Sequence, residues 1–112
     1  MRYIHLRNVK PEDTAEIFSY KDQIKVIASQ KQDGSGFNIE ETRQAIRILE
    51  ALQPLDPHSG ILQLEDADYA YLTAKLKTWK FGMAHAVLID FYDDIMNAGS
   101  ERPAHLVSEV TA

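Results

Sequence analysis

Cysteine is absent from this sequence of 112 residues, and proline, glycine and tryptophan are scarce, with four, five and one residues. Without cysteine, disulfide bonds, thiol catalysis, thiolate zinc sites and iron–sulfur clusters are excluded. Runs of about 18 apolar residues, which a membrane span needs, are also absent, and the N-terminus lacks the apolar stretch of a signal peptide. We therefore expect a cytoplasmic protein that binds no membrane and holds its core together by packing alone.

Basic residues are in the minority, with 12 Lys and Arg against 17 Asp and Glu, which gives a net charge of −5. Such a chain has no general basic field to attract nucleic acid, so nucleic acid is not expected as a partner. Residues 1–50 contain eight basic and eight acidic residues, whereas residues 51–112 contain four and nine. The whole acidic excess therefore lies in the second part of the chain.

The length and a hydrophobic content of 45% are those of one small domain. We predict a single compact domain over residues 1–98. The remaining residues, 99–112, contain Pro103 and show no strong period, so they are predicted to form a mobile C-terminal tail.

Two short strands are predicted near the start and the middle of the chain. Residues 2–7 alternate between polar and apolar side chains, and residues 61–65 read Ile-Leu-Gln-Leu-Glu. Pairing between them would remove an exposed edge from each, and helices must cover the resulting ribbon. Residues 9–18 contain Pro11 and no sustained period, which predicts a connection with at most one helical turn.

Two shorter helices are predicted over residues 20–30 and 39–53. Each is preceded by a capping residue with an acid three positions later, namely Ser19 with Asp22 and Asn38 with Glu41. Between them, residues 32–36 include two glycines and predict a turn or mobile loop. A phosphate-cradling loop is the less favoured alternative, because the Lys and the Ser or Thr of such a loop do not follow Gly36.

A longer helical pattern follows over residues 67–97, with Asp66 as the predicted N-cap. Its apolar positions keep close to the helical period: Leu72, Leu76, Trp79, Met83, Val87, Phe91 and Ile95. Gly82 and the cluster of lysines before it predict a kink or a break near Phe81 and Gly82. The predicted fold class is therefore α+β and mainly helical, with two short strands, two shorter helices and one long kinked or broken C-terminal helix.

No catalytic signature is present, and we predict no enzyme activity, no catalytic residue and no cofactor or metal site. Asp90, Asp93 and Asp94 share a helix face, but hard cations need more oxygen ligands than one face supplies. A solvated acidic face is the favoured interpretation, ahead of a metal site or an acidic docking patch. His85 is flanked by apolar residues, where a hydrogen-bonded structural role is favoured over a base or a switch.

Aromatic residues are concentrated in the last helical segment, since six of the ten lie within residues 69–92. They cannot all face one narrow stripe. One interpretation is a helix buried on most sides within this protein, and the other is an interface in which a second apolar face packs on another subunit. The candidate interface residues are Tyr71, Trp79, Phe81, Met83, Leu88 and Tyr92.

The order of three further features resembles small proteins encoded by tailed phages and prophages. These features are the helix entry Phe18 to Tyr20, the helix opening Gly36 to Arg43, and the stretch Leu64 to Tyr69 before a helix with a tryptophan. The resemblance covers residues 16–98 and transfers no functional residue. It implies a role in virion assembly or host interaction, similar to that of small helical tail-assembly proteins.

The hypothesis that follows is a non-enzymatic protein–protein interaction or assembly protein, phage-derived and self-associating, located in the host cytoplasm or the virion. Its expected partners are copies of itself and other phage or host proteins. A regulatory or inhibitory binder of a host protein is the first alternative, and a small metal-dependent enzyme is a weaker one.

Overall fold

Two strands from distant parts of the sequence form the larger sheet. β1 (Arg2–His5) pairs antiparallel with β4 (Ile61–Leu64), so the predicted pairing of these two segments is confirmed.

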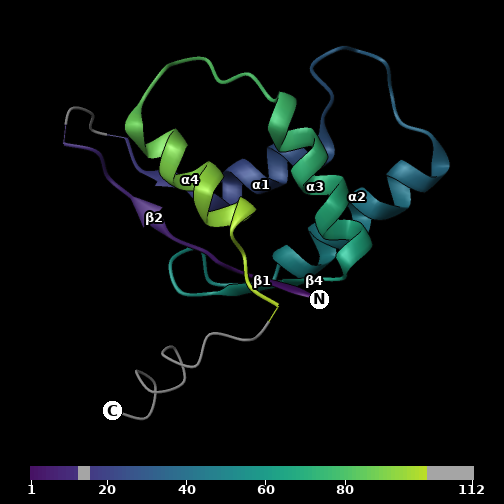
Figure 1. Cartoon of the computed structure of the whole chain (residues 1–112), viewed down its shortest axis with the longest axis horizontal. Helices are drawn as coiled ribbons and strands as arrows, with labels where there is room; N and C mark the ends of the chain where they lie inside the picture. Colours follow the sequence, from purple (N-terminus) through teal and green to yellow (C-terminus); the bar gives the residue numbers. More distant parts are fainter. Residues whose placement is uncertain (13–15, 101–112) are drawn as a thin grey trace, which may run out of the picture.

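The structure is a computed structural model that describes residues 1–12 and 16–100. The described part of the chain forms four helices and two small antiparallel sheets, which is the predicted α+β class (Figure 1).

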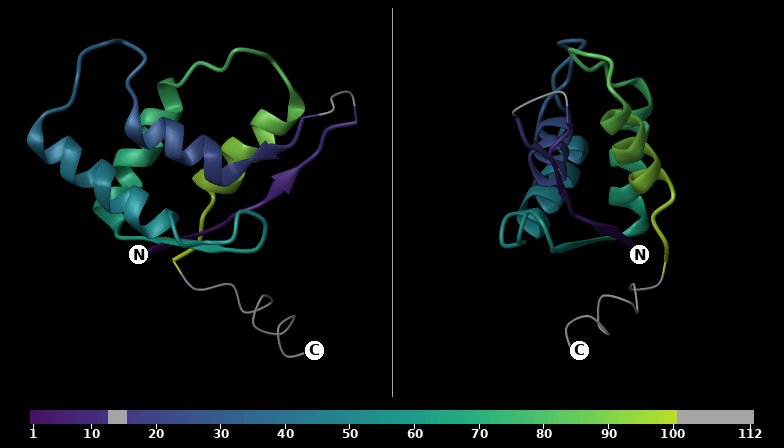
Figure 2. Two further views of the ribbon diagram at one scale, coloured as in Figure 1. Left: turned by 180° about the vertical axis from the view of Figure 1, so that it is seen from behind. Right: turned by 90° about the vertical axis from the view of Figure 1, so that its left-hand side faces the viewer.

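A second, smaller sheet lies where the sequence pattern predicts only a connection, so that prediction is wrong. β2 (Asn8–Val9) pairs antiparallel with β3 (Phe18–Ser19). Strands of two residues are too short to show an alternating pattern, and only their tertiary pairing reveals them. β3 runs directly into the first helix, so this small sheet fixes where that helix starts (Figure 2).

The helices α1 (Tyr20–Ser29) and α2 (Ile39–Leu52) follow the two capping residues that the sequence predicts. The Ser19 hydroxyl accepts a hydrogen bond from the backbone N–H three residues later, at 3.3 Å. Asn38 and Glu41 form a complete capping box, with reciprocal bonds of 2.7 and 3.1 Å. Both helix starts are confirmed, because a cap is a local interaction that sequence spacing can reveal.

A single long helix over residues 67–97 is not observed, because the segment forms two separate helices. α3 (Asp66–Thr78) ends within the lysine cluster. α4 (Ala86–Met96) starts after Gly82. His85 caps α4, since its imidazole Nδ1 accepts a hydrogen bond from the backbone N–H two residues later at 3.0 Å. The helix is thus broken in the region where the glycine predicts a kink or a break. A side-chain cap then starts the second helix.

The predicted N-cap of α3 is wrong by one residue. Glu65 occupies the N-cap position without a side-chain hydrogen bond, and Asp66 instead binds the N-terminal ammonium of Met1 at 2.5 Å. Two residues after Asp66, Asp68 is buried, and its carboxylate accepts three hydrogen bonds of 2.8 to 3.1 Å from the Arg47 guanidinium. A buried carboxylate needs such a partner, so this pair ties α2 to α3.

The core lies between two helical layers and the β1–β4 sheet. Figure 2 shows α1 and α2 on one side, α3 and α4 on the other, and the sheet across one end. Phe91 of α4 is fully buried, and the rings of Phe18, Tyr20 and Phe81 pack edge-on against it with centroids 5.4, 5.0 and 6.4 Å away. The largest buried aliphatic side chains of the described residues surround this group: Ile4, Leu6, Ile24, Ile27, Ile48, Leu52, Leu62, Leu72, Leu76 and Ile95.

The chain that follows α4 returns to the edge of β1. The Tyr3 N–H donates to the Gly99 carbonyl at 3.1 Å, and the Arg2 guanidinium donates to the Ala98 carbonyl at 2.8 Å. The predicted mobile tail therefore begins with a residue that is hydrogen-bonded to the sheet. The remainder of that prediction, residues 101–112, lies outside the described residues.

Gly60 precedes β4 in a turn that leaves no room for a side chain. A Cβ atom at this position would lie 2.7 Å from the Asp56 carbonyl oxygen and 2.9 Å from the Leu55 Cβ. We expect Gly60→Ala to lower the free energy of unfolding by about 1–3 kcal/mol, because the backbone of the turn must move to admit the methyl group. Urea denaturation checks this, with Gly82→Ala as the matched control.

At Gly82 a Cβ atom would meet nothing within 4 Å. The control substitution should therefore change the free energy of unfolding by less than about 1 kcal/mol, in the stabilising direction. Equal stability losses in the two variants would contradict the close contact inferred for Gly60.

Candidate functional site

Trp79 lies at the C-cap of α3 and lines two hollows in the surface. The first has a volume of about 400 Å³ and lies between the β2–β3 segment, α1, the connection from α3 to α4 and the first turn of α4. We call it the apolar groove. Its lining residues are Pro11, Glu16, Ile17, Phe18, Gln23, Trp79, Lys80, Phe81, Gly82, Met83, His85, Val87 and Leu88.

The apolar groove has a firm aromatic floor and an exposed apolar rim. Phe18 and Phe81 are half-buried and pack on the ring of Phe91, which fixes them in place. Ile17 and Met83 are each 62% exposed. Covering such side chains is favourable by about 25 cal/mol per Å² of apolar surface, so this part of the surface is suited to a macromolecular partner.

Four of the six predicted interface residues lie together in the apolar groove: Trp79, Phe81, Met83 and Leu88. The break between α3 and α4 brings them together, since on one continuous helix Phe81 and Leu88 would point away from the face that holds Trp79 and Met83. Tyr71 lies in the second hollow, and Tyr92 lines neither hollow and packs half-buried against the core.

The sequence pattern misses Ile17 and Phe18, which also line the apolar groove. They belong to the segment interpreted as a connection. The only available signal is a pair of adjacent apolar residues just before the Ser19 cap, and such a pair has no periodicity to interpret.

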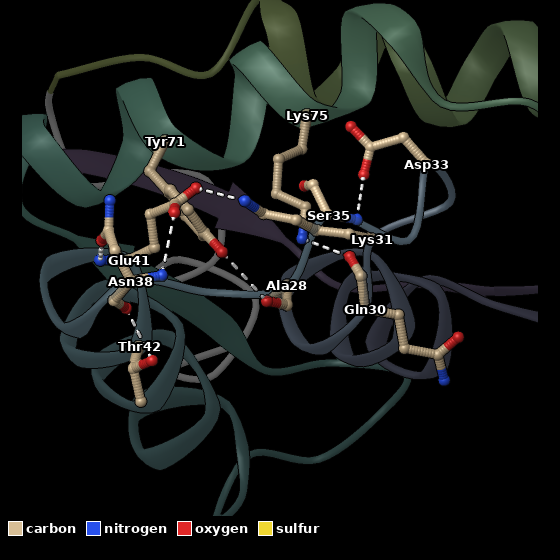
Figure 3. Close-up of polar contacts among 10 residues, drawn as sticks. All are labelled: Ala28, Gln30, Lys31, Asp33, Ser35, Asn38, Glu41, Thr42, Tyr71 and Lys75. Carbon is tan, nitrogen blue, oxygen red and sulfur yellow. Dashed lines mark hydrogen bonds and ion pairs between the residues drawn. The ribbon is translucent and has the colours of Figure 1, made fainter.

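The second hollow has a volume of about 610 Å³ and lies between α3 and the segment that links α1 to α2. We call it the lysine pocket. Figure 3 shows Tyr71 and Lys75 reaching from α3 toward that segment, where Lys31 forms an ion pair with Glu41 at 2.7 Å. The lining residues are Lys31, Gln32, Asp33, Glu41, Tyr71, Ala74, Lys75, Thr78, Trp79 and Lys80.

The ammonium of Lys75 is surrounded by aromatic rings. It lies 4.9 Å from the ring centroid of Phe37, 5.4 Å from that of Tyr71 and 6.0 Å from that of Trp79. Burial lowers the pKa of Lys75, and the nearby charge of Lys31 lowers it further. Ring faces attract the ammonium, but they replace only part of the hydration that burial removes.

Lys75 and Tyr71 also bond to the end of α1. The Lys75 ammonium donates to the Gln30 carbonyl, and the Tyr71 hydroxyl donates to the Ala28 carbonyl at 3.3 Å. The last turn of α1 has no basic residue of its own, so a lysine from α3 supplies the positive charge that a helix C-terminus favours.

The acidic face of α4 is partly used in the fold. Asp94 accepts hydrogen bonds from Arg7 at 2.7 Å and from the hydroxyl of the buried Tyr20 at 2.6 Å. Asp90 and Asp93 are exposed. Within residues 1–12 and 16–100, no group of three or more His, Asp or Glu side chains could hold a metal ion.

No family model, curated protein or solved structure matches the chain. None of the helices in the described part of the chain is both long and apolar enough to cross a membrane. The function proposed for this protein therefore rests on the geometry of the apolar groove.

Proposed function

We propose that this chain is a non-enzymatic protein–protein interaction module that associates with a second copy of itself through the apolar groove. One observation carries the proposal: four of the six predicted interface residues share a groove whose rim residues Ile17 and Met83 are each 62% exposed. Aromatic residues and methionine are enriched in the buried centres of protein interfaces.

A second copy fits because an exposed apolar side chain lies at the rim of a recess. Met83 is exposed beside a groove lined by Trp79, Phe81 and Leu88. In a two-fold dimer the same patch faces itself, so Met83 of each copy can enter the groove of the other. A flexible thioether side chain adapts well to such a recess.

The apolar groove has no excess of charge of one sign. Its lining contains one acidic residue, Glu16, and one basic residue, Lys80. Two copies of the groove that face each other would therefore not repel one another through like charges. This balance is notable in a chain whose overall charge is −5.

The finer parts of the hypothesis stay predictions. A phage origin, a role in virion assembly and a location in the host cytoplasm or the virion come from the sequence resemblance alone. A host protein is the alternative occupant of the apolar groove, and the oligomeric state of the isolated protein distinguishes it from a second copy.

Sedimentation velocity at micromolar concentration tests the proposal. We expect the unmodified protein to sediment as a dimer, and we expect Met83→Glu and Ile17→Glu each to weaken the dimer about tenfold or more, because a carboxylate would be desolvated in the interface. Both side chains are largely exposed, so these changes should leave the fold intact. Phe81 and Tyr92 are less suitable positions because both pack against the core.

The matched control is Ile39→Glu. Ile39 is 68% exposed at the start of α2 and does not line the apolar groove. The control should dimerise as tightly as the unmodified protein. A monomeric unmodified protein, or equal weakening by the control, would overturn self-association through this groove.

A further inference from the structure

The lysine pocket contains an ammonium group without a carboxylate partner. Glu41 forms an ion pair with Lys31, and the carboxylate of Asp33 accepts the Ser35 N–H at 3.0 Å within its own loop. Among the described residues, no carboxylate lies within ion-pair distance of Lys75. Its strong polar contact is with the Gln30 carbonyl, which carries only a partial negative charge.

An anion in the lysine pocket would relieve two unfavourable effects at once. Lys75 is partly withdrawn from water, and it lies near a second ammonium, that of Lys31. Both effects disfavour the charged form of the amine, and both are offset when an anion lies close to the two lysines. Glu41 and Asp33 offset part of this effect from a distance, but neither carboxylate forms an ion pair with Lys75.

The walls of the lysine pocket are suited to a planar ring. Tyr71, Ala74, Lys75 and Thr78 lie on one face of α3, and Trp79 follows at the helix end. The volume of about 610 Å³ is in the range of small-molecule sites, and aromatic walls with a few charged groups are typical of them.

The loop that closes the lysine pocket is held by polar contacts. Gln32 receives a hydrogen bond from the Lys80 N–H at 2.8 Å and donates one to the Lys80 carbonyl at 2.6 Å. This reciprocal pair joins the α1–α2 link to the end of α3. The pocket is therefore formed before any ligand binds, which lowers the entropy that binding must overcome.

We propose that the lysine pocket binds a small organic anion that carries a planar ring, with Lys75 and Lys31 facing the anionic group and Tyr71 and Trp79 flanking the ring. This inference does not depend on self-association, because the ligand site and the apolar groove share only Trp79 and Lys80.

Titration with adenosine monophosphate tests the inference, with adenosine and inorganic phosphate as partial probes. Trp79 is the only tryptophan of the chain, so its fluorescence reports directly on the pocket. We expect saturable binding of adenosine monophosphate, and at least tenfold weaker binding of adenosine and of phosphate. Isothermal titration calorimetry provides a second readout. The titration is repeated with Met83→Glu, because Trp79 also lines the apolar groove.

Variants of two lysines on the same helix separate binding from stability. Lys75→Met should weaken the binding of adenosine monophosphate at least tenfold, whereas Lys75→Arg should keep it within about threefold. Lys77→Met is the matched control, since Lys77 is exposed on α3 outside the lysine pocket, and it should bind as the unmodified protein does. Circular dichroism of each variant confirms that the fold is retained.

Four results would overturn the inference. The first is no saturable binding of adenosine monophosphate at millimolar concentration. The second is equal binding of adenosine, which would remove the role of the anion, and the third is equal binding of inorganic phosphate, which would remove the role of the ring. The fourth is equal weakening by Lys75→Met and Lys77→Met.

Discussion

Replacing Phe91 by alanine is expected to lower the free energy of unfolding by about 3–5 kcal/mol. The Phe91 side chain is fully buried, and the rings of Phe18, Tyr20 and Phe81 all pack edge-on against it. Removing the central ring leaves a cavity that three rigid neighbours cannot fill, and it also removes the ring contacts. A loss of this size is a large fraction of the stability of a small domain.

Urea denaturation measures this loss, and Ile89→Ala provides the control on the same helix. Ile89 is 64% exposed, so its truncation should change the free energy of unfolding by less than about 0.5 kcal/mol. Because Phe18 and Phe81 rest on Phe91 and line the apolar groove, the Phe91 variant should also dimerise more weakly. If Phe91→Ala lowers the free energy of unfolding by less than about 1 kcal/mol, the packing of the four rings does not stabilise the core as inferred.

Raising the pH from 10 to 12 is expected to lower the free energy of unfolding by about 2–3 kcal/mol through Tyr20 alone. Burial, together with the hydrogen bond to Asp94, raises the pKa of Tyr20 to about 12, although the hydrogen bond from Arg7 acts in the opposite direction. The unfolded chain releases the phenolic proton near pH 10, whereas the folded chain keeps it up to about pH 12. The stability from the neutral phenol is therefore complete below pH 10 and is lost between pH 10 and 12.

Tyr20→Phe isolates this contribution from the titration of lysines in the same range. The variant has no phenolic proton, and Arg7 can still pair with Asp94 directly. It should be about 1 kcal/mol less stable than the unmodified protein at neutral pH, because of the lost hydrogen bonds. Between pH 10 and 12 its stability should fall less steeply, and equal slopes in urea denaturation would contradict the raised pKa.

The local interactions of this fold could be predicted from the sequence. Ser19 and Asn38 cap α1 and α2 because each contacts an N–H only three residues away. The β1–β4 pair could be predicted from the alternation of polar and apolar residues along the sequence. Gly82 and the lysines before it signalled that the helix is interrupted, and His85 shows how the chain restarts it.

Most of the candidate site could not be predicted, because its residues come from segments that are distant in the sequence. Phe18 and Phe81 are 63 positions apart along the chain, yet both pack on Phe91. Similarly, Lys75 meets the end of α1, a contact that depends on how α3 packs across that helix. No periodicity or spacing records contacts of this kind.

The sequence by itself determined the α+β class, the two capped helices, the two segments that form the main strand pair and the clustering of aromatics in one segment, since all of these follow from local spacing and composition. Only the tertiary structure decided that Trp79 lines both an apolar groove and a lysine pocket. The apolar groove depends on where α4 turns after the break, a direction set by the packing of Phe91 against Phe18 and Tyr20. The lysine pocket depends on how α3 packs beside the end of α1. No local pattern encodes either set of contacts.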